Sequence, residues 1–324
     1  MSIASFFKSR TPGRASSSGT LGVQASDAGM TTAVVRRPPG EKPQLTDYHA
    51  FVGAQAMPAL ATWRRKNGHL GTSANLLLGL GDYQILPIDM PEMPDAELAD
   101  AARWKVKDMI DFPAEQASVA CVLVPSADQG APAAGRSRQA LAVVTQRATV
   151  AQWMTRSRDA KLALQAIDIP ELALRNVAAL LPGTAACGLL HVGLTRTTLV
   201  MVWQGELCSF RRFDLTASQL LAANDDSRNA LIERLALDLQ RTSDAFERQF
   251  YAAALGPMRV IEEIEGLTLA PLLSQHFSSK VLPFHLREHL DFTGAPTHPL
   301  VDADQGIDFI PAIGAALRDE APSP

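Results

Sequence analysis

The chain has 324 residues, of which 47% are apolar and 20% are charged, and its formal net charge is −4. This composition excludes a disordered chain, and the length is sufficient for two lobes with a cleft between them. The small net charge gives no general attraction to nucleic acid, so we expect no nucleic-acid partner. Three cysteines without a CxxC spacing indicate a reducing compartment and no disulfide framework: Cys121, Cys187 and Cys208.

The first 17 residues are expected to form a flexible basic arm. Residues 1–17 mix Ser, Gly and Pro with Lys and Arg, and they lack the apolar stretch of a secretory signal. An alternative interpretation uses Phe6 and Phe7, beside the basic side chains, as a weak contact to a membrane surface. The best candidate for a membrane span, residues 177–194, is interrupted by Pro182, so no transmembrane helix is expected.

Strand and helix patterns alternate along the first half of the chain. Two strands are predicted over 20–25 and 30–36, joined by a Ser-Asp-Ala-Gly turn. The turn residues Gly81-Asp82 predict a second hairpin, between strands over 75–80 and 84–88. The other elements follow from apolar periodicity, N-cap residues and stop signals. They are helices over 53–66, 95–110, 148–163 and 170–181, and strands over 119–124, 139–145 and 164–169.

The second half of the chain opens like the first. Strands are predicted over 187–193, 197–203 and 207–214, and an apolar stripe at helical spacing predicts a long helix over 229–250. The shorter elements are strands over 260–264 and 281–284 and helices over 268–277 and 310–318. Because the opening hairpin of the second half repeats that of the first, the sequence predicts an α/β fold of two related halves with a cleft between them.

Both opening hairpins resemble the phosphate-binding hairpins of actin-like ATPases. Leu21-Gly22-Val23-Gln24-Ala25-Ser26 is similar to the first, and His191-Val192-Gly193-Leu194 is similar to the second. Within this superfamily the chain resembles the PilM group of type IV pilus assembly proteins, and above all its MshI branch, which is tied to the mannose-sensitive pilus. Further stretches carry the resemblance: 86–91, 97–105, 110–113, 142–145, 165–176 and 309–318.

The resemblance implies a two-lobed actin-like (ASKHA) fold with an inserted 1C subdomain of the PilM/FtsA type. Its subdomains are expected in chain order. They are 1A over 18–86, the insert 1C over 87–165, a 1A helix and linker over 166–184, 2A over 185–228, 2B over 229–260, a return to 2A over 261–304, and a closing 1A helix over 305–320.

The function implied by the resemblance is a cytoplasmic scaffold of the inner-membrane platform that assembles a type IV pilus. Its expected partner is the cytoplasmic tail of a single-span PilN-like protein, which would also hold the chain at the membrane. We expect the tail to lie in a groove between 1A and 1C, with the helix over 95–110 and the strand over 119–124 as walls. Other platform proteins and a homo-oligomeric ring are further partners that the resemblance implies.

The nucleotide cleft that the resemblance implies has lost several of its functional residues. Gln24 stands where the family has an aspartate, Ser26 where it has a glycine, and His191 where it has an acidic residue. A neutral amide and an imidazole are poor partners for magnesium, which prefers oxygen ligands.

The other expected nucleotide-binding positions of this degenerate cleft are Gly193, Thr195 and Gly266. We therefore expect a pseudo-ATPase with no catalytic residue, no metal and no required cofactor, although ATP binding stays open. The alternative is an actin-like ATPase that couples nucleotide state to pilus or type II secretion assembly.

Several other motifs are interpreted as structural. Gly79-Leu80-Gly81 is taken as a hairpin turn and not a dinucleotide loop. His285 and His289 have the spacing of metal ligands on a helix, but no third ligand is evident, so they are interpreted as part of a solvated face. The run Trp63-Arg64-Arg65-Lys66 is interpreted as a basic helix end, and Cys187 and Cys208 as core thiols.

Overall fold

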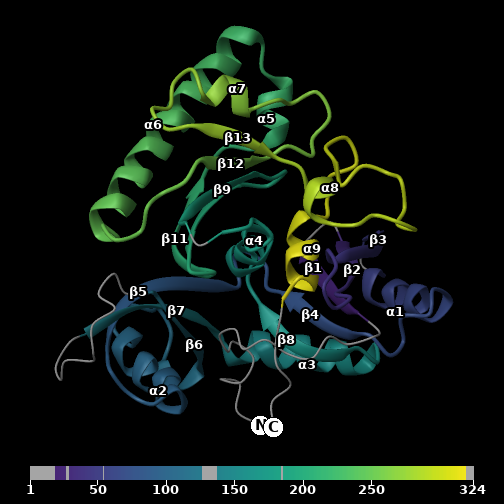
Figure 1. Ribbon diagram of the computed structural model, residues 1–324. Coiled ribbons are helices and arrows are strands. Elements are labelled where there is room, and N and C mark those ends of the chain that lie inside the picture. The colour runs from purple at the N-terminus through teal and green to yellow at the C-terminus, as the bar shows by residue number, and fades with distance from the viewer. Residues whose placement is uncertain (1–18, 27–28, 54, 126–136, 184, 319–324) are drawn as a thin grey trace.

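The computed structural model describes residues 19–26, 29–53, 55–125, 137–183 and 185–318 (Figure 1). The basic arm predicted over 1–17 lies outside the described residues. No helix within these ranges is long and apolar enough to cross a bilayer.

The first lobe is built on a five-stranded sheet with the strand order β3-β2-β1-β4-β8. Its strands are β1 (Thr20–Ser26), β2 (Gly29–Arg36), β3 (Gln44–Val52), β4 (Ser73–Leu77) and β8 (Ala163–Asp168). β1, β2 and β3 pair antiparallel, whereas β4 pairs parallel to both β1 and β8. Helix α1 (Ala56–Lys66) packs beside β3, and α3 (Arg147–Asp159) packs beside β8.

The second lobe repeats this topology with the strand order β11-β10-β9-β12-β13. Its strands are β9 (Cys187–Val192), β10 (Thr197–Trp203), β11 (Glu206–Phe213), β12 (Met258–Ile261) and β13 (Val281–Phe284). Its helices are α5 (Ala217–Ala222), α6 (Asp225–Gln249) and α7 (Ala270–Leu273). The repeat confirms the prediction of two related halves, down to the antiparallel hairpin followed by two parallel strands.

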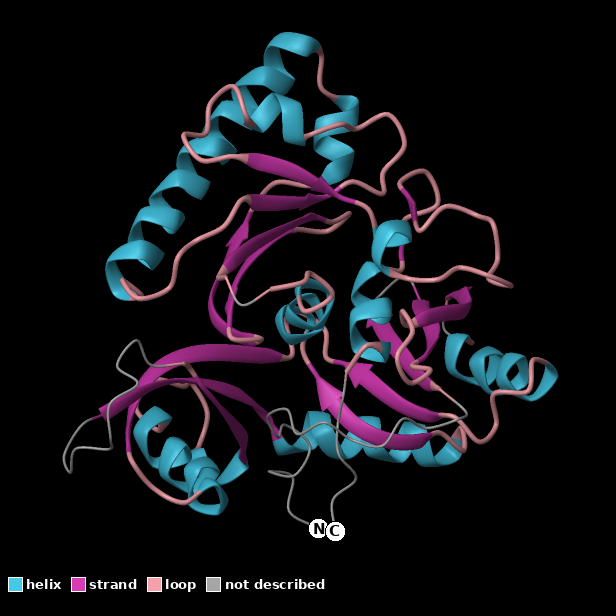
Figure 2. Ribbon diagram, in the orientation of Figure 1, coloured by secondary structure: helices cyan, strands magenta, loops and turns pink. Residues whose placement is uncertain are grey.

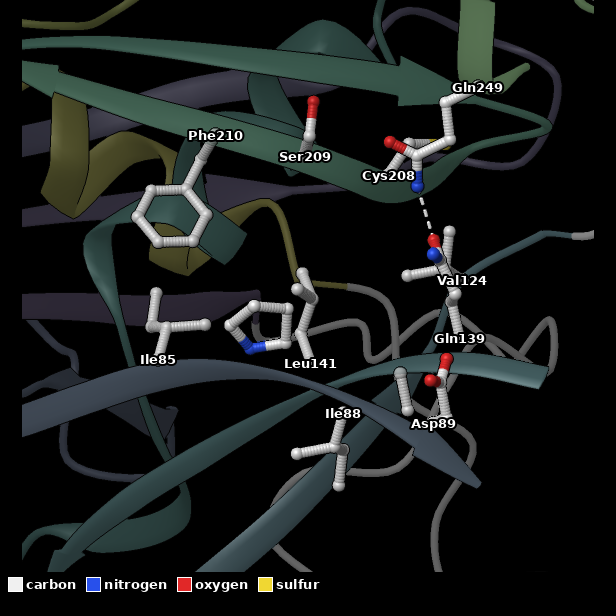
Figure 3. A pocket seen from close by; sticks show the side chains of 12 residues that line it. Ile85, Ile88, Asp89, Val124, Gln139, Leu141, Cys208, Ser209, Phe210 and Gln249 are labelled. Atoms are coloured by element: carbon white, nitrogen blue, oxygen red, sulfur yellow. Dashed lines mark hydrogen bonds between the residues drawn. The ribbon is translucent and has the colours of Figure 1, made fainter. Parts of the chain in front are cut away.

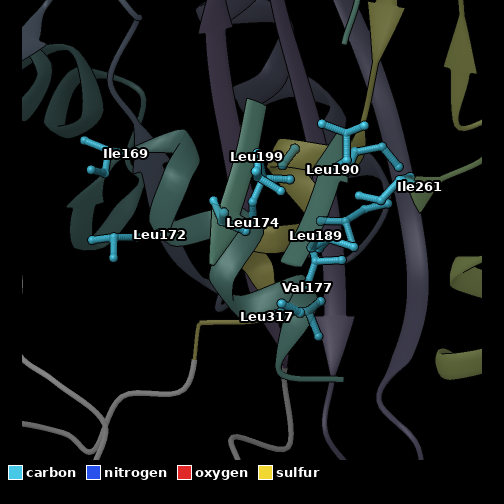
Figure 4. Packing of buried hydrophobic residues seen from close by; sticks show 14 of the residues in the cluster. Ile169, Leu172, Leu174, Val177, Leu189, Leu190, Leu199, Ile261 and Leu317 are labelled. Atoms are coloured by element: carbon cyan, nitrogen blue, oxygen red, sulfur yellow. The ribbon is translucent and has the colours of Figure 1, made fainter. Parts of the chain in front are cut away.

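Two helices cross between the lobes (Figures 1 and 2). α4 (Pro170–Ala178) follows the last strand of the first sheet but packs on β9, β10 and β11 of the second. α9 (Ile310–Ala316) ends the second half but packs on β1, β2 and β4 of the first. Figure 4 shows Leu174 and Val177 of α4 among Leu189, Leu190 and Leu199 of the second sheet. Each half therefore completes its core with a helix from the other.

The insert is a three-stranded antiparallel sheet with the order β5-β7-β6. Its elements are β5 (Tyr83–Pro91), α2 (Asp95–Val106), the short 3-10 helix η2 (Ala114–Gln116), β6 (Ala117–Leu123) and β7 (Ser137–Gln146). Leu98, Ala102 and Val106 of α2 pack on one face of this sheet in a core of their own. The observed insert thus runs from Tyr83 to Gln146, whereas the sequence assigned 87–165 to it, and β8 pairs within the first lobe.

The hairpin predicted around Gly81-Asp82 is wrong. Asp82 N–H donates to the Gly79 carbonyl, so a turn is present. However, β4 before it belongs to the first sheet and β5 after it to the insert. A turn signal of this kind shows where the chain bends but not with which strand the next segment pairs.

A strap (residues 285–309) returns the chain from the second lobe to the first. It contains α8 (Leu286–His289), β14 (Val301–Asp302) and β15 (Ile307–Asp308). Leu45 N–H on β3 donates to the Asp291 carbonyl at 2.8 Å, and the Tyr48 hydroxyl donates to the Pro296 carbonyl at 2.9 Å. These bonds fasten the strap along the outer strand of the first sheet before the chain enters α9.

Candidate functional site

The first predicted phosphate hairpin is the β1–β2 turn. Gln24 is half-buried and lies opposite Thr31 on β2 and Leu77 on β4. Ser26 is exposed at the end of β1, opposite Gly29, and its hydroxyl donates to the Gly29 carbonyl at 3.4 Å. Neither side chain carries a negative charge that could order a metal ion.

The second predicted hairpin is the β9–β10 turn. Gly193 N–H donates to the Arg196 carbonyl at 3.2 Å, and a Cβ at Gly193 would lie 2.8 Å from the same oxygen. This contact explains the glycine without a ligand, while Thr195 is exposed in the turn. His191 is buried, and its Nε2 lies 3.1 Å from Oδ2 of Asp308 on the strap. The imidazole therefore faces a carboxylate of this chain.

Gly266, the last of the expected nucleotide-binding positions, lies in an exposed turn after β12. Its φ is +76, a conformation that glycine adopts without strain. The side chain of Glu262, four residues earlier in the chain, points to the start of α7. Glu262 Oε1 accepts the backbone N–H groups of Leu269 at 2.8 Å and Ala270 at 2.6 Å. A carboxylate of the chain thus uses the two amides that begin this helix.

Asp308 and Glu262 were both missed by the sequence analysis. Asp308 Oδ1 accepts the N–H of Ile310 at 3.0 Å, so it also satisfies the start of α9. An acidic residue shortly before a helix that carries Pro311 in its first turn is a recognisable start signal. The signal indicates the helix start but not the contact with His191, because the two residues are more than a hundred positions apart.

The other candidate motifs have structural roles. His285 and His289 are half-buried and not on the solvated face that was expected. His285 Nδ1 lies 3.1 Å from the Glu262 carbonyl, and the His289 ring stacks on Phe284. Within the described ranges no group of three potential ligands is arranged for a metal ion. Cys208 is buried as predicted, whereas Cys187 is half-buried at the edge of the core. Burial raises the pKa of the Cys187 thiol to about 11 and that of Cys208 to about 12.

A cavity of about 490 Å³ lies between the insert and the second lobe (Figure 3). Its floor comes from the sheet face of the insert that is opposite to α2, and its roof from β11 and the end of α6. Phe210 points from β11 towards Ile85 and Leu141, and the Gln249 side chain donates to Gln139 at the other end. The lining residues are Ile85, Pro87, Ile88, Asp89, Val124, Gln139, Ala140, Leu141, Cys208, Ser209, Phe210 and Gln249.

This cavity differs from the groove that the sequence analysis expected. The expected walls were the helix over 95–110 and the strand over 119–124, but α2 covers the opposite face of the insert sheet. Val124 is the only residue of those two segments among the lining residues. The roof strand β11 is the terminal strand of its sheet, and β5 is the terminal strand of the insert sheet. Both edges therefore have backbone groups that no neighbouring strand uses among the described residues.

Beside the cavity, a buried cluster joins three parts of the molecule. Glu171, in the first turn of α4, accepts the Tyr83 hydroxyl of β5 at 2.6 Å and Nε of Arg212 on β11 at 2.6 Å. Arg212 Nη2 also donates to the Tyr83 hydroxyl at 2.8 Å. Burial, followed by the Glu171 charge, raises the pKa of Tyr83 well above its usual value. The insert, the crossing helix and the second lobe thus meet at one carboxylate.

More polar contacts follow along α4. Arg175 Nη1 donates to Glu206 of β11 at 2.9 Å, and Asn176 Nδ2 donates to the Gly314 carbonyl of α9 at 2.9 Å. Asp168, just before α4, pairs with Arg318 just after α9. No sequence signal marked these residues, because an acidic first turn and a basic last turn are ordinary helix features.

Comparison with known proteins gives a likeness in structure only. No family model matches the chain, and no curated protein matches it in sequence. A PilM–PilN type IV pilus biogenesis complex contains a chain that is similar over 93% of this one and 98% of its own length, with a TM-score of 0.67 and 18% identity. The chain has an actin-like fold.

The cytoplasmic domain of EpsL, an inner-membrane component of the type II secretion system of Vibrio cholerae, is also similar. That match covers 82% of this chain and 89% of the domain, with a TM-score of 0.50 and 13% identity. The two-lobed architecture with an insert, predicted from the sequence, is thus the architecture of the chain.

Proposed function

We propose that this protein is a scaffold of an inner-membrane assembly platform and binds the cytoplasmic tail of a PilN-like membrane protein in the cavity between the insert and the second lobe. The observation that carries the proposal is the cavity itself, which has an apolar floor beneath an open sheet edge. Its occurrence in a fold similar to a chain of a PilM–PilN complex supports the choice of partner.

The chemistry of the cavity suits an extended peptide. The free edge of β11 offers main-chain hydrogen bonds, and Ile85, Leu141 and Phe210 offer apolar contacts for alternate side chains. At the other end, Asp89, Gln139 and Gln249 suit a polar or basic side chain. A contact of this size fits an affinity on the order of micromolar, which a ring of copies would raise through avidity.

Within this function we place the protein in the MshI branch, as a cytoplasmic component held at the inner membrane by its partner. The residues that resemble that branch support this assignment, together with the PilM-like fold. Other platform proteins are then further partners of the same assembly.

The cleft between the lobes has a structural and not a catalytic role in this proposal. Gln24 supplies no charge, His191 faces Asp308, and Glu262 uses the amides at the start of α7. These residues fit magnesium-bound ATP poorly, because the phosphates need free amides and the metal needs free carboxylates.

A phosphate-release assay tests the role of the cleft. We expect no magnesium-dependent ATP turnover above that of a no-protein control. The double variant Gln24→Asp, His191→Asp should not gain tight ATP binding, because the turn at Gly266 keeps a single glycine and Glu262 still uses the amides at the start of α7. Turnover that is lost on Gly193→Val, or tight binding by the double variant, would contradict the proposal.

Fluorescence polarisation tests the tail-binding site. The labelled ligand is a synthetic peptide with the sequence of the cytoplasmic tail of a single-span PilN-like protein from the same organism. Wild type should bind it, and Ile85→Glu should weaken binding at least about tenfold, because a carboxylate replaces an apolar floor contact. Leu237→Glu, on the exposed side of α6, is the matched control and should bind like wild type. Equal binding by a folded Ile85→Glu variant would place the tail elsewhere.

A further inference from the structure

We propose that Tyr83, Glu171 and Arg212, called here the Glu171 latch, hold the insert at a fixed position against the second lobe and thereby keep the cavity preformed. The effect on ligand binding rests on the proposed function, whereas the effect on the position of the insert does not.

The latch joins side chains from three elements that are far apart in the sequence. Glu171 is 0% exposed, and its two carboxylate oxygens accept bonds from two different parts of the molecule. One oxygen accepts from Tyr83 on the first strand of the insert, and the other accepts from Arg212 on the edge strand of the second lobe. The carboxylate makes these bonds across the interface, which sets it apart from an acidic residue that merely caps its own helix.

The latch is continuous with the cavity walls. Tyr83 lies two residues before Ile85 on β5, and Arg212 lies two residues after Phe210 on β11. The Arg212 guanidinium lies 5.1 Å from the centre of the Tyr83 ring and 5.5 Å from the centre of the Phe210 ring. A shift of Arg212 would therefore move the aromatic wall of the cavity, and a shift of Tyr83 would move its floor.

The energetics of a buried charge predict opposite effects for removing only the cation of the latch and for removing both charges. A carboxylate that is fully buried is tolerated when it is paired, but it is costly once its partner is removed. In Arg212→Met the Glu171 carboxylate would lose its cation, and movement of the insert away from the second lobe would let water reach it. Adding Glu171→Gln removes the unpaired negative charge. In the double variant the insert should therefore return in part towards the second lobe.

The expected signature is a change in the distance between the insert and the second lobe. Spin labels at Glu97 on α2 and Glu233 on α6, both exposed, would report that distance by pulsed electron paramagnetic resonance in a full-length chain whose native cysteines are replaced. Wild type should give one narrow distribution. Arg212→Met should broaden it, and Arg212→Met with Glu171→Gln should narrow it again.

Arg211→Met is the matched control. Arg211 precedes Arg212 on β11, but its guanidinium pairs with Asp238 at the protein surface. Its distribution should equal that of wild type. Tyr83→Phe removes one hydroxyl only and should broaden the distribution less than Arg212→Met. If Arg212→Met fails to fold, Tyr83→Phe carries the test in its place. A wild-type distribution in a folded Arg212→Met variant, or in Tyr83→Phe when that variant carries the test, would overturn the latch.

Peptide binding separates the latch from the proposed function. With the tail peptide, Arg212→Met should bind about tenfold or more weakly than Arg211→Met, in line with the loss of charge-assisted bonds. If the distances change as expected but wild type does not bind the peptide, the latch stands and the proposed function fails. If wild type binds and the distances do not respond, the latch fails alone.

Discussion

Arg64 is buried although the residues that follow it in the sequence are exposed. It lies in a basic run at the end of α1, where Arg65 and Lys66 are exposed, and the sequence predicted a basic helix end for this run. The helix does end there, but Arg64 is 0% exposed. Its guanidinium donates to the carbonyls of Lys161 and Leu70, at 3.0 and 3.2 Å. Tertiary carbonyls of this kind leave no pattern in the sequence around the arginine.

Arg64→Met should destabilise the protein by roughly 3 kcal/mol, because the apolar Met side chain cannot replace the charge-assisted hydrogen bonds of the buried guanidinium. The measurement is the free energy of unfolding in urea. Arg65→Met, one position along the same helix and exposed, is the matched control and should change stability by less than about 0.5 kcal/mol. Equal effects of the two variants would mean that the bonds of Arg64 contribute nothing to stability.

His289 makes stability depend on pH. Its ring stacks on Phe284 at 4.5 Å, and desolvation lowers its pKa below the usual 6.5. Desolvation also lowers the pKa of His49, although Asp47 opposes that shift. For both residues the unfolded chain binds the proton more readily than the folded protein. Their contribution to stability is therefore complete above pH 6.5 and is lost as the pH falls through the lower pKa of the folded state.

The expected result is a lower free energy of unfolding at pH 5.5 than at pH 7.5, and a smaller difference in His289→Phe, which keeps an aromatic ring beside Phe284. Glu263 acts in the opposite direction, because burial raises its pKa above the usual 4.5. Its contribution is common to wild type and His289→Phe, so the comparison of the two proteins isolates His289. His276→Phe, at an exposed position, should keep the full wild-type difference. A pH dependence unchanged by His289→Phe would refute the role of this residue.

At the scale of elements, β3 shows why part of the fold could not be predicted. Its buried residues Leu45, Tyr48 and Phe51 recur every three positions and not every two. A register shift between Val34 and Val35 of β2 inserts an extra residue into β3, which breaks the alternation on which strand prediction depends. α5 was missed for another reason. It has only six residues, too few for periodicity, although Thr216 and Gln219 form a capping box.

Two glycines allow the crossing helices to approach their neighbours closely. A Cβ at Gly314 of α9 would lie 2.3 Å from the Ala173 carbonyl oxygen of α4. A Cβ at Gly22 of β1 would lie 1.9 Å from the Ala312 carbonyl oxygen of α9. The atoms that would be met belong to the backbone, so no side chain can rotate away.

Gly314→Ala should therefore lower the free energy of unfolding by about 1–3 kcal/mol or more, because α4 and α9 must separate. Gly71→Ala is the control, since nothing lies within 4 Å of a Cβ at that position. It should stay within about 0.5 kcal/mol of wild type. Chemical denaturation of the three proteins decides between these outcomes, and a neutral Gly314→Ala would mean that the helices adjust without cost.

For the whole molecule, the sequence was informative because the chain is a repeat. The repeated hairpins predicted two related halves, and both sheets have the same strand order. The resemblance implied that the closing helix over 305–320 returns to the first lobe, where α9 packs, but it also assigned α4 to the first lobe. No sequence pattern indicated that α4 packs on the second sheet. The contact between His191 and Asp308 and the Glu171 latch have the same origin, because both depend on how the halves are placed together.

The exchange of helices has a consequence for how the molecule unfolds. A single continuous core extends through both lobes and includes Leu172 and Val177 of α4 and Ile310 and Ile313 of α9. Neither lobe can unfold without exposing apolar surface of the other half, so the lobes should unfold together. This expectation is specific to the crossing arrangement, because two lobes joined only by a linker would unfold at separate midpoints.

The variant Phe246→Ala tests this coupling from one side. Phe246 is buried in the second lobe and stacks on Phe250 at 4.7 Å, so its loss should cost about 3–5 kcal/mol there. Hydrogen exchange measured by mass spectrometry across a urea series would follow β2 in the first lobe and β12 in the second. With coupled lobes, the midpoints of both strands shift down together and by the same amount. If only the midpoint of β12 shifts while β2 keeps its wild-type value, the lobes are independent and the exchanged helices do not join them energetically.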